Sequence, residues 1–191
     1  MSKGDFVYDL QEIRKRAREH IQKGSVTSSY KANRGVVIKI LNEALATELV
    51  CVLRYKRHFF MAQGIDATNA TQEFAEHAKD EQGHADQIAM RITQLGGEPN
   101  FSPVGLVDRS HSEYQEGSGL SEMIQEDLVA ERIAIDSYTE MILYVGEDDV
   151  TTRRMLEDIL ASEEEHANDM ANLLKKMNPL PIKKNDQVVM D

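Results

Sequence analysis

The chain has 191 residues and a formal net charge of −11, with 33 Asp and Glu against 22 Lys and Arg. This length predicts one domain with at most an extension, and the acidic surface favours cations over polyanions as partners. The single cysteine, Cys51, excludes an intramolecular disulfide framework and a Cys-rich metal site. Scarce aromatic residues (6%), no Trp, four Pro and nine Met are typical of a helical protein and not of a β-sandwich.

The first 34 residues differ from the rest in charge. They hold eight Lys or Arg and four Asp or Glu, which leaves −15 on the remainder of the chain. "QEIRKRAREHIQKG" predicts a short basic helix that ends near Gly24, and the Ser/Thr-rich "GSVTSSY" predicts a linker. The N-terminus has no apolar core of signal-peptide type. The longest apolar-rich stretch, "GVVIKILNEALATELVCVL", contains charged residues and is a poor membrane span, so we expect a cytoplasmic protein without a membrane partner.

Four long helical patterns follow this basic extension. They span residues 35–63, 69–95, 120–146 and 149–177. Glycines and prolines end the patterns, as is usual for helices. Two short connections and one long crossover (97–119) predict an all-α, ferritin-like four-helix bundle over 35–177, with the crossover between the second and third helices. The tail 178–191 contains two prolines and predicts no clear fifth helix.

Each of the four helices carries an apolar stripe whose steps alternate between three and four residues, the spacing of a buried seam. A carboxylate interrupts each stripe near its middle: Glu48, Glu81, Glu131 and Glu163. Unpaired buried carboxylates cost several kcal/mol or take up protons, and four that face one another also repel. A pair of bound cations removes both problems.

The inward carboxylates belong to a two-fold internal repeat. Two of them are followed by a tyrosine seven residues on, and two by a histidine three residues on. The pairs are Glu48 with Tyr55, Glu131 with Tyr138, Glu81 with His84, and Glu163 with His166. Four Glu and two His suit iron or manganese and leave zinc possible. The pattern therefore predicts a dinuclear metal site with these six residues as ligands.

Each residue of this pattern also has a plainer interpretation. A single Glu-x-x-His is usually a surface helix pair, but two of them inside apolar stripes favour the metal site. Tyr55 and Tyr138 are either core residues or hydrogen-bond donors to the ligand carboxylates. His77 is either a satisfied, partly buried histidine, a neighbour of the ligands, or a transient iron site. Gly83 has a candidate role in letting a neighbouring helix approach, at about 1 kcal/mol of helix propensity.

The six candidate ligands resemble the di-iron centre of the ferritin-like superfamily. The stretches "LNEALATELV", "RYKRHFF" and "HAKDEQGHADQIAMRITQLGGEPNF" are similar to bacterioferritins, and the resemblance covers about residues 35–177. It implies that Glu48 and His84 are terminal ligands of one iron and that Glu131 and His166 hold the other. It further implies that Glu81 and Glu163 bridge the two ions and that Tyr55 lies beside the centre.

The resemblance implies a ferroxidase that oxidises Fe(II) with O2 or H2O2 and stores ferric mineral in a hollow homo-oligomer. Bacterioferritins carry a haem-binding Met immediately after the second-helix Glu, where this chain has Gln82, so haem is doubtful. The tail without a fifth helix favours a twelve-subunit shell of the Dps-like mini-ferritin type over one of twenty-four. Dps-like proteins, however, build their usual iron site between subunits and with other ligands.

Three alternatives to storage stay open at this point. The ligand set also suits a di-metal peroxidase, or a manganese catalase, that acts without storage. The basic arm at residues 1–34, repeated around a shell, can contact DNA phosphates multivalently as in a DNA-protecting Dps-type protein. The negative body opposes DNA binding, and packing of the arm along a neighbouring subunit is the favoured alternative.

Overall fold

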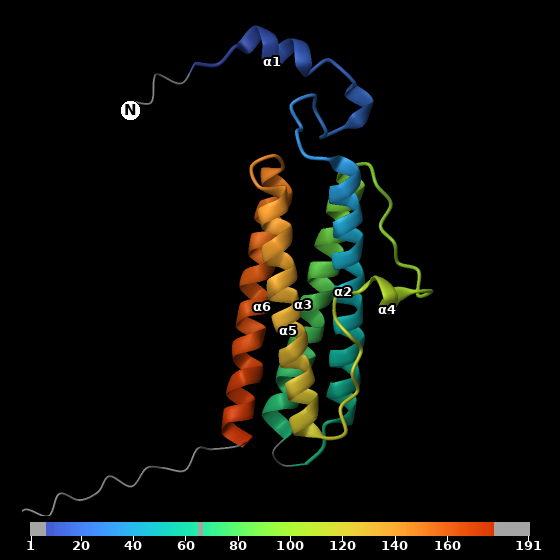
Figure 1. Cartoon of the computed structure of the whole chain (residues 1–191), viewed down its shortest axis with the longest axis vertical. Coiled ribbons are helices and arrows are strands. Elements are labelled where there is room, and N and C mark those ends of the chain that lie inside the picture. Colours follow the sequence, from blue (N-terminus) through green and yellow to red (C-terminus); the bar gives the residue numbers. More distant parts are fainter. Residues whose placement is uncertain (1–6, 65–66, 178–191) are drawn as a thin grey trace, which may run out of the picture.

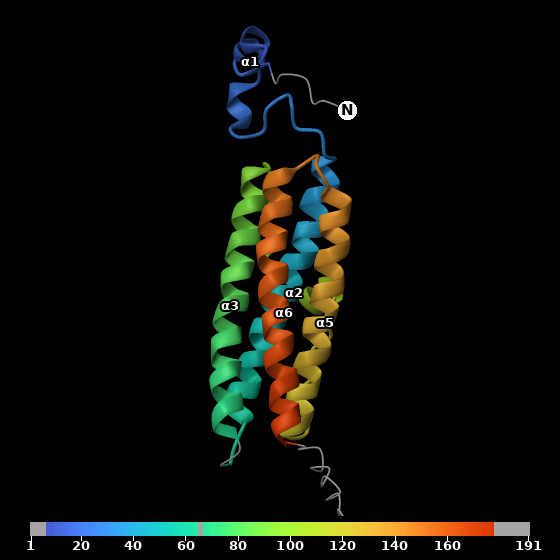
Figure 2. The same ribbon diagram turned by 90° about the vertical axis from the view of Figure 1, so that its left-hand side faces the viewer.

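The four predicted long helices form one bundle. A computed structural model describes residues 7–64 and 67–177, and these residues contain helices and no strand. Its long helices stand side by side (Figures 1 and 2). They are α2 (Arg34–Met61), α3 (Ala67–Gln94), α5 (Leu120–Val145) and α6 (Val150–Met177). Every end lies within two residues of its predicted position, and the all-α bundle class is confirmed.

The connectivity places two helix hairpins against each other. The hairpin partners α2 with α3 and α5 with α6 make the most extensive contacts. Between the hairpins, the crossover returns along the length of the bundle beside α2 and contains the short helix α4 (Leu106–Arg109) (Figure 1). Because of this single long crossover, α3 and α5 run in the same direction, as predicted for a ferritin-like bundle.

Side chains of α2 fix the crossover in place. Asn42 Oδ1 accepts a hydrogen bond from the backbone N–H of Asn100 at 2.7 Å. Thr47 Oγ1 accepts one from the N–H of His111 at 2.9 Å. These contacts satisfy backbone groups of a loop that has no ladder of its own, so the long connection follows α2 closely.

A buried charged group connects α2 with α5 below this loop. Arg54, His58 and Asp127 are all fully buried. Arg54 Nε lies 2.8 Å from Asp127 Oδ1, and His58 Nδ1 lies 2.8 Å from Asp127 Oδ2. Arg54 also donates to the crossover, to Ser112 Oγ at 3.1 Å. The Asp127 carboxylate therefore holds two side chains of α2. Through Arg54, it also connects to the crossover at Ser112.

The core is divided into two apolar clusters along the bundle axis. The first includes Leu41, Leu45, Ile88, Ile92, Leu156 and Ile159. The second includes Phe74, Ala78, Ile124, Met170 and Leu173. The interrupting carboxylates predicted from the sequence lie between the two clusters in every helix. The apolar clusters therefore hold the helices together on both sides of one buried polar layer.

The basic N-terminal segment forms less helix than predicted. Helix α1 (Leu10–Arg16) buries no side chain, and the chain turns at His20, whose φ of 50° is left-handed, before the 3-10 turn η1 (Ile21–Lys23). A short helix that packs on nothing is marginal, which explains why it ends at Arg16 and not near Gly24. The predicted linker is attached to the bundle: Tyr30 donates to Asp149 Oδ2 at 3.0 Å.

Two sequence predictions concern the chain ends. The first is that the tail 178–191 forms no clear fifth helix, and this tail lies outside the described residues. The second, the division into extension, bundle and tail, stays a prediction.

Across 7–64 and 67–177, no helix has the length and apolar character that a membrane span requires.

The proposed packing role of Gly83 is wrong within the chain. A Cβ placed on Gly83 meets no other atom within 4 Å. We therefore expect Gly83→Ala to raise the free energy of unfolding of the metal-free protein by about 1 kcal/mol, through helix propensity alone. Gly97→Ala is the matched control, because its Cβ would lie 2.8 Å from Ile38 Cγ2 and should destabilise. Urea denaturation measures both, and a loss of stability in Gly83→Ala would contradict the account.

Candidate metal centre

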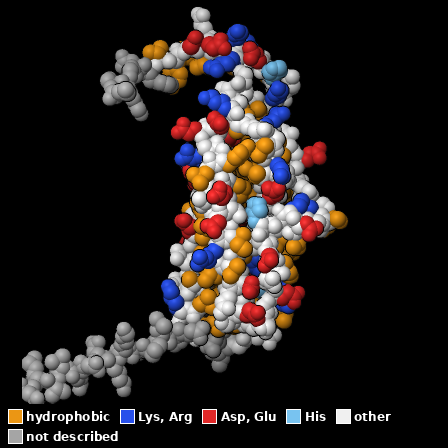
Figure 3. All heavy atoms as spheres, in the orientation of Figure 1, with side chains coloured by type: hydrophobic (Ala, Val, Ile, Leu, Met, Phe, Trp, Pro, Cys, Tyr) orange, Lys and Arg blue, Asp and Glu red, His pale blue; other side chains and the backbone are white. Residues whose placement is uncertain are grey.

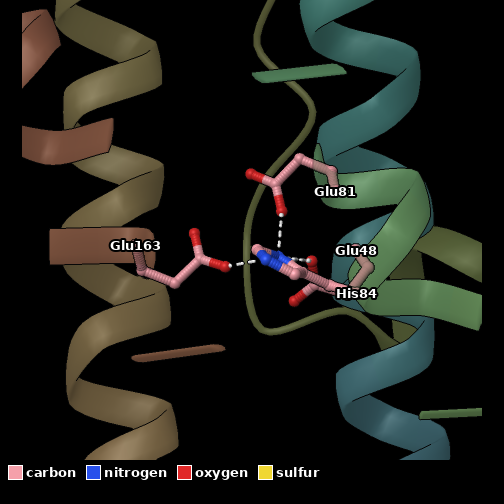
Figure 4. Close-up of side chains that lie close together, drawn as sticks. All are labelled: Glu48, Glu81, His84 and Glu163. Atoms are coloured by element: carbon pink, nitrogen blue, oxygen red, sulfur yellow. Dashed lines mark hydrogen bonds and ion pairs between the residues drawn. The ribbon is translucent and has the colours of Figure 1, made fainter. Parts of the chain in front are cut away.

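All six predicted ligands lie together in the polar layer between the two apolar clusters. Each of the four long helices contributes at least one of them, and each is at most 7% exposed. Figure 4 shows Glu48, Glu81, His84 and Glu163 converging from three helices on one point. Each candidate ligand lies on the same helix face as the apolar stripe, so burial of the stripe turns the ligand side chain inward.

The ligand atoms divide into two overlapping groups. One consists of Glu48, Glu81, His84 and Glu163, and the other of Glu81, Glu131, Glu163 and His166. Within each group, one ligand atom per residue lies within 4.8 Å of the others. Glu81 and Glu163 belong to both groups, so the two candidate groups share these two carboxylates.

Unpaired buried atoms concentrate at this site. Among the described residues, seven buried side-chain nitrogen or oxygen atoms lack a hydrogen-bond partner, and six of them belong to the candidate ligands. They are Glu48 Oε2, Glu81 Oε1, Glu131 Oε2, both carboxylate oxygens of Glu163, and His166 Nδ1. Buried polar atoms are rarely left unsatisfied. Oxygen donors with imidazole nitrogen and no thiolate suit iron or manganese, so the residues fit the predicted metal pair.

His84 shows the same need for a cation. Its Nδ1 lies 2.9 Å from Glu163 Oε1, 3.2 Å from Glu81 Oε2 and 3.4 Å from Glu48 Oε2 (Figure 4). One N–H cannot donate to three carboxylates, and its hydrogen bond goes to Glu81; the 2.9 Å contact is an ion pair whose geometry leaves Glu163 Oε1 without a hydrogen bond. A metal ion at this position would contact all four side chains at once.

The outer carboxylates, Glu48 and Glu131, which each belong to one ligand group only, hold protons in the metal-free site. Burial, and next the charge of Glu81, raise the pKa of Glu48 to about 8. Burial, followed by the charges of Glu81 and Glu163, raises the pKa of Glu131 well above its ordinary value. Both groups are therefore largely neutral acids near pH 7 when no metal is bound.

The two shared carboxylates, Glu81 and Glu163, and the two imidazoles are instead charged in the metal-free site. Burial and a neighbouring carboxylate raise the pKa of Glu81 and of Glu163, but close contacts with both imidazoles outweigh these two effects and lower it. Burial disfavours the imidazolium of His166, yet contacts with Glu163 and Glu81 raise its pKa to about 10; contacts with three carboxylates raise the pKa of His84 likewise. The metal-free site is thus close to neutral, with protons where cations would bind.

This protonation makes the stability of the metal-free protein depend on pH. Between pH 6.5 and 8, folded Glu48 (pKa about 8, ordinarily 4.5) and His166 (pKa about 10, ordinarily 6.5) hold protons that the unfolded chain has lost. The folded state binds more protons, so the free energy of unfolding should fall as pH rises, by about 1.4 kcal/mol per pH unit and group. Urea denaturation at pH 6.5 and 8 measures this slope.

The control for that experiment is Glu48→Gln, which cannot titrate and should show a smaller slope than the wild-type protein. A metal-free protein that becomes more stable between pH 6.5 and 8 would contradict the protonation that the site geometry implies.

Two buried tyrosines support the outer carboxylates across the bundle. Tyr55 on α2 donates its hydroxyl hydrogen to Glu131 on α5, and Tyr138 on α5 donates to Glu48 on α2. Both rings are at most 1% exposed. The contacts are reciprocal, as the two-fold repeat in the sequence predicts. They fix the orientation of the carboxylates, and partners of this kind typically tune metal affinity.

His77 also lies beside the centre. Its ring stacks on that of His166 with centroids 3.9 Å apart, and its Nδ1 lies 3.2 Å from the Tyr55 hydroxyl. Burial and His166 lower the pKa of His77 to about 3, so the ring is neutral. Sequence reasoning singled out His77 but missed its neighbours Glu73 and Asp169, which form a further ligand group with it.

Comparison with known proteins identifies the class. A family model described as ferritin-like domain matches residues 38–180, and the chain belongs to this family. A bacterioferritin of Mycobacterium tuberculosis is 30% identical over 145 residues, 75% of this chain and 87% of that protein. The predicted resemblance is confirmed.

Two solved structures share the fold at similar identity. A dodecameric thioferritin, the bacterioferritin-related protein of Bacteroides fragilis, has a TM-score of 0.75 and 29% identity and covers 78% of this chain and 89% of its own. The Desulfovibrio desulfuricans bacterioferritin, described with a diiron site in different catalytic states, has a TM-score of 0.68 and 26% identity, with coverages of 77% and 82%.

Proposed function

We propose that the protein is a ferroxidase that oxidises Fe(II) at a di-iron centre within each chain and stores the ferric product in a hollow homo-oligomer. The observation that supports this most is the pair of ligand groups that share Glu81 and Glu163 within one chain. Family membership and the diiron site described for the Desulfovibrio relative support the same reading.

The ligand roles follow from the two groups. Glu48 and His84 hold one iron, Glu131 and His166 hold the other, and Glu81 and Glu163 contact both. Hard carboxylate oxygens suit iron and manganese ions. Two adjacent Fe(II) ions, as substrate, together supply two electrons. These electrons, with two protons, reduce one H2O2 to two waters or one O2 to H2O2. The same ligands would accept manganese.

The four buried side chains that carry protons in the metal-free site also serve this chemistry. Ligands must be deprotonated before they bind metal, so loading of the centre releases protons from the two imidazolium rings, from Glu48 and from Glu131. Tyr55 and Tyr138 keep the outer carboxylates oriented while this happens, since each hydroxyl donates to one oxygen and leaves the second for the ion.

We propose a twelve-subunit shell, as in the dodecameric Bacteroides relative. Large apolar side chains remain exposed on the bundle, among them Phe60 (74%), Leu143 (70%) and Met90 (62%). Figure 3 shows apolar side chains interspersed with charged ones on the visible face of the bundle. Subunit contacts in a shell would cover exposed apolar side chains of this kind. The N-terminal arm exposes Val7 and Ile21 by 80% or more, which favours packing on a neighbouring subunit over DNA binding.

Native mass and iron content test storage directly. Both are measured on the purified protein before and after aerobic addition of excess Fe(II). A shell that retains far more than two irons per chain is the expected result, and its mass gives the number of subunits. A small oligomer that holds two metals per chain and no more would reject storage and favour the di-metal peroxidase or catalase function.

A gel mobility shift at low salt tests the DNA alternative. The expected result is that the full chain and a chain without residues 1–34 behave alike. A shift that only the full chain produces would show that the basic arm binds DNA.

A further inference from the structure

Three potential ligands lie together outside the proposed di-iron centre. Glu73 and His77, one helical turn apart on α3, meet Asp169 of α6, and one ligand atom of each lies within 4.8 Å of the others. His77 is 3% exposed. The side chains of Glu73 and Asp169 are 32% and 38% exposed. The group therefore combines a buried imidazole with two carboxylates that solvent can reach.

The hydrogen bonds around Tyr55 determine which nitrogen of His77 is free. Tyr55 gives its only hydroxyl hydrogen to Glu131, so toward His77 its oxygen can only accept. The contact of 3.2 Å between this oxygen and His77 Nδ1 is then a hydrogen bond donated by Nδ1. With Nδ1 as the donor, the neutral form of the imidazole, which has one N–H, presents its lone pair at Nε2.

That lone pair faces two further acceptors. His77 Nε2 lies 3.6 Å from Asp169 Oδ2 and 3.8 Å from Glu73 Oε2. Both distances exceed that of a hydrogen bond. Burial and the nearby charge of Asp169 raise the pKa of Glu73, as expected for carboxylates that face each other without a cation. Three electron-pair donors thus converge on one point.

We propose that Glu73, His77 and Asp169 form a third metal site, which takes one divalent first-row transition-metal ion such as Fe(II), Mn(II) or Zn(II). One imidazole nitrogen and two carboxylates suit these ions and leave coordination positions for water. Two ligands about 2.1 Å from one ion lie roughly 3.0–3.4 Å apart at tetrahedral or octahedral angles. The two separations from His77 Nε2, 3.6 and 3.8 Å, need to close by roughly 0.2–0.8 Å, which rotation of the part-exposed carboxylates can supply.

The third site is directly linked to the di-iron centre. His77 stacks on the ligand His166 and, through Tyr55, is hydrogen-bonded to the ligand Glu131. The six ligands of the centre are at most 7% exposed, whereas the two carboxylates of the third site reach solvent. An ion at the third site is therefore the exchangeable one, held at the surface beside the buried pair.

Binding of Co(II) under anaerobic conditions tests the site without any activity measurement. Co(II) suits the same ligands. Full-length metal-free protein is equilibrated with Co(II), and bound metal per chain is measured by elemental analysis. Four proteins are compared: wild type, Glu73→Gln/Asp169→Asn, the control Glu76→Gln/Glu165→Gln, and Glu81→Gln/Glu163→Gln. The control removes two exposed carboxylates from the same two helices.

We expect about three ions per chain for the wild type and the control, about two for Glu73→Gln/Asp169→Asn, and about one for Glu81→Gln/Glu163→Gln, as the three ligand groups require. Equal metal content in the wild type and Glu73→Gln/Asp169→Asn overturns the third site. A wild type with about one ion, lost in Glu73→Gln/Asp169→Asn, supports the third site and rejects the di-iron centre, so the two proposals fail separately.

A crystal soaked in Co(II) gives the position of the ion independently. Anomalous density between His77 Nε2 and the carboxylates of Glu73 and Asp169 is the expected result. Full occupancy of the buried centre with no density at this position would overturn the proposal.

Discussion

Replacing both Glu81 and Glu163 by glutamine should abolish rapid Fe(II) oxidation while leaving the bundle folded. These two carboxylates belong to both ligand groups, so their loss weakens the binding of both ions at once. Glutamine keeps the shape of each side chain but removes the charge that a bridging ligand needs. We expect the initial rate to fall by roughly 100-fold or more, since loss of partners outside the ligand set already costs 10–100-fold.

Stopped-flow measurement of Fe(II) oxidation, at two Fe(II) per chain, provides the rate, and far-UV circular dichroism checks the fold. Glu164→Gln is the matched control, because Glu164 is exposed on the same helix next to Glu163 and its loss should leave the rate unchanged. Initial rates in Glu81→Gln/Glu163→Gln that equal those of the wild type would reject the assigned centre.

Arg54→Met should cost about 3–5 kcal/mol of stability, the usual result of removing one partner from a buried ion pair. Arg54 and Asp127 are fully buried and 2.8 Å apart. The substitution leaves the Asp127 carboxylate buried with His58 as its remaining side-chain partner. It also removes the donor that Arg54 offers to the crossover at Ser112.

Urea denaturation of the metal-free protein measures this loss. The control is Arg57→Met, one helical turn away along α2's surface, where the partner Glu116 is 62% exposed. Exposed ion pairs contribute only about 0–1 kcal/mol, so the control should be close to neutral. Equal, small losses in both variants would show that the buried group does not hold α2, α5 and the crossover together.

Much of the fold follows from the spacing of apolar residues. The stripes in 35–63, 69–95, 120–146 and 149–177 predict the four helices to within two residues at each end, because burial of a stripe determines where a helix continues. The N-terminal segment lacks such a stripe. Its helix ends at Arg16, where propensity without packing no longer supports it, and charge composition could not predict this.

The six central residues were predictable because a carboxylate inside an apolar stripe is costly and therefore informative. The two tyrosines followed from the internal repeat, and their hydrogen bonds to Glu131 and Glu48 confirm that interpretation. The buried pair of Arg54 and Asp127 was missed. Residues 73 positions apart meet only through the packing of two helices, and neither residue interrupts a stripe in the way the ligands do.

The same limit applies to Glu73 and Asp169. Both are part-exposed acidic residues in a chain with 33 Asp and Glu, and in sequence they resemble any solvated helix face. Only their positions around the free nitrogen of His77 distinguish them, and these positions depend on how α3 and α6 lie against each other. The cytoplasmic location and the choice between O2 and H2O2 stay predictions.

Anomalous diffraction at the iron edge, from crystals of metal-free protein soaked anaerobically in Fe(II), tests the di-iron centre most directly. The account predicts two peaks inside each bundle, with Glu81 and Glu163 between them. One peak should contact Glu48 and His84, and the other Glu131 and His166. A bundle with one peak or none in the polar layer, while iron binds elsewhere on the chain, would contradict the account.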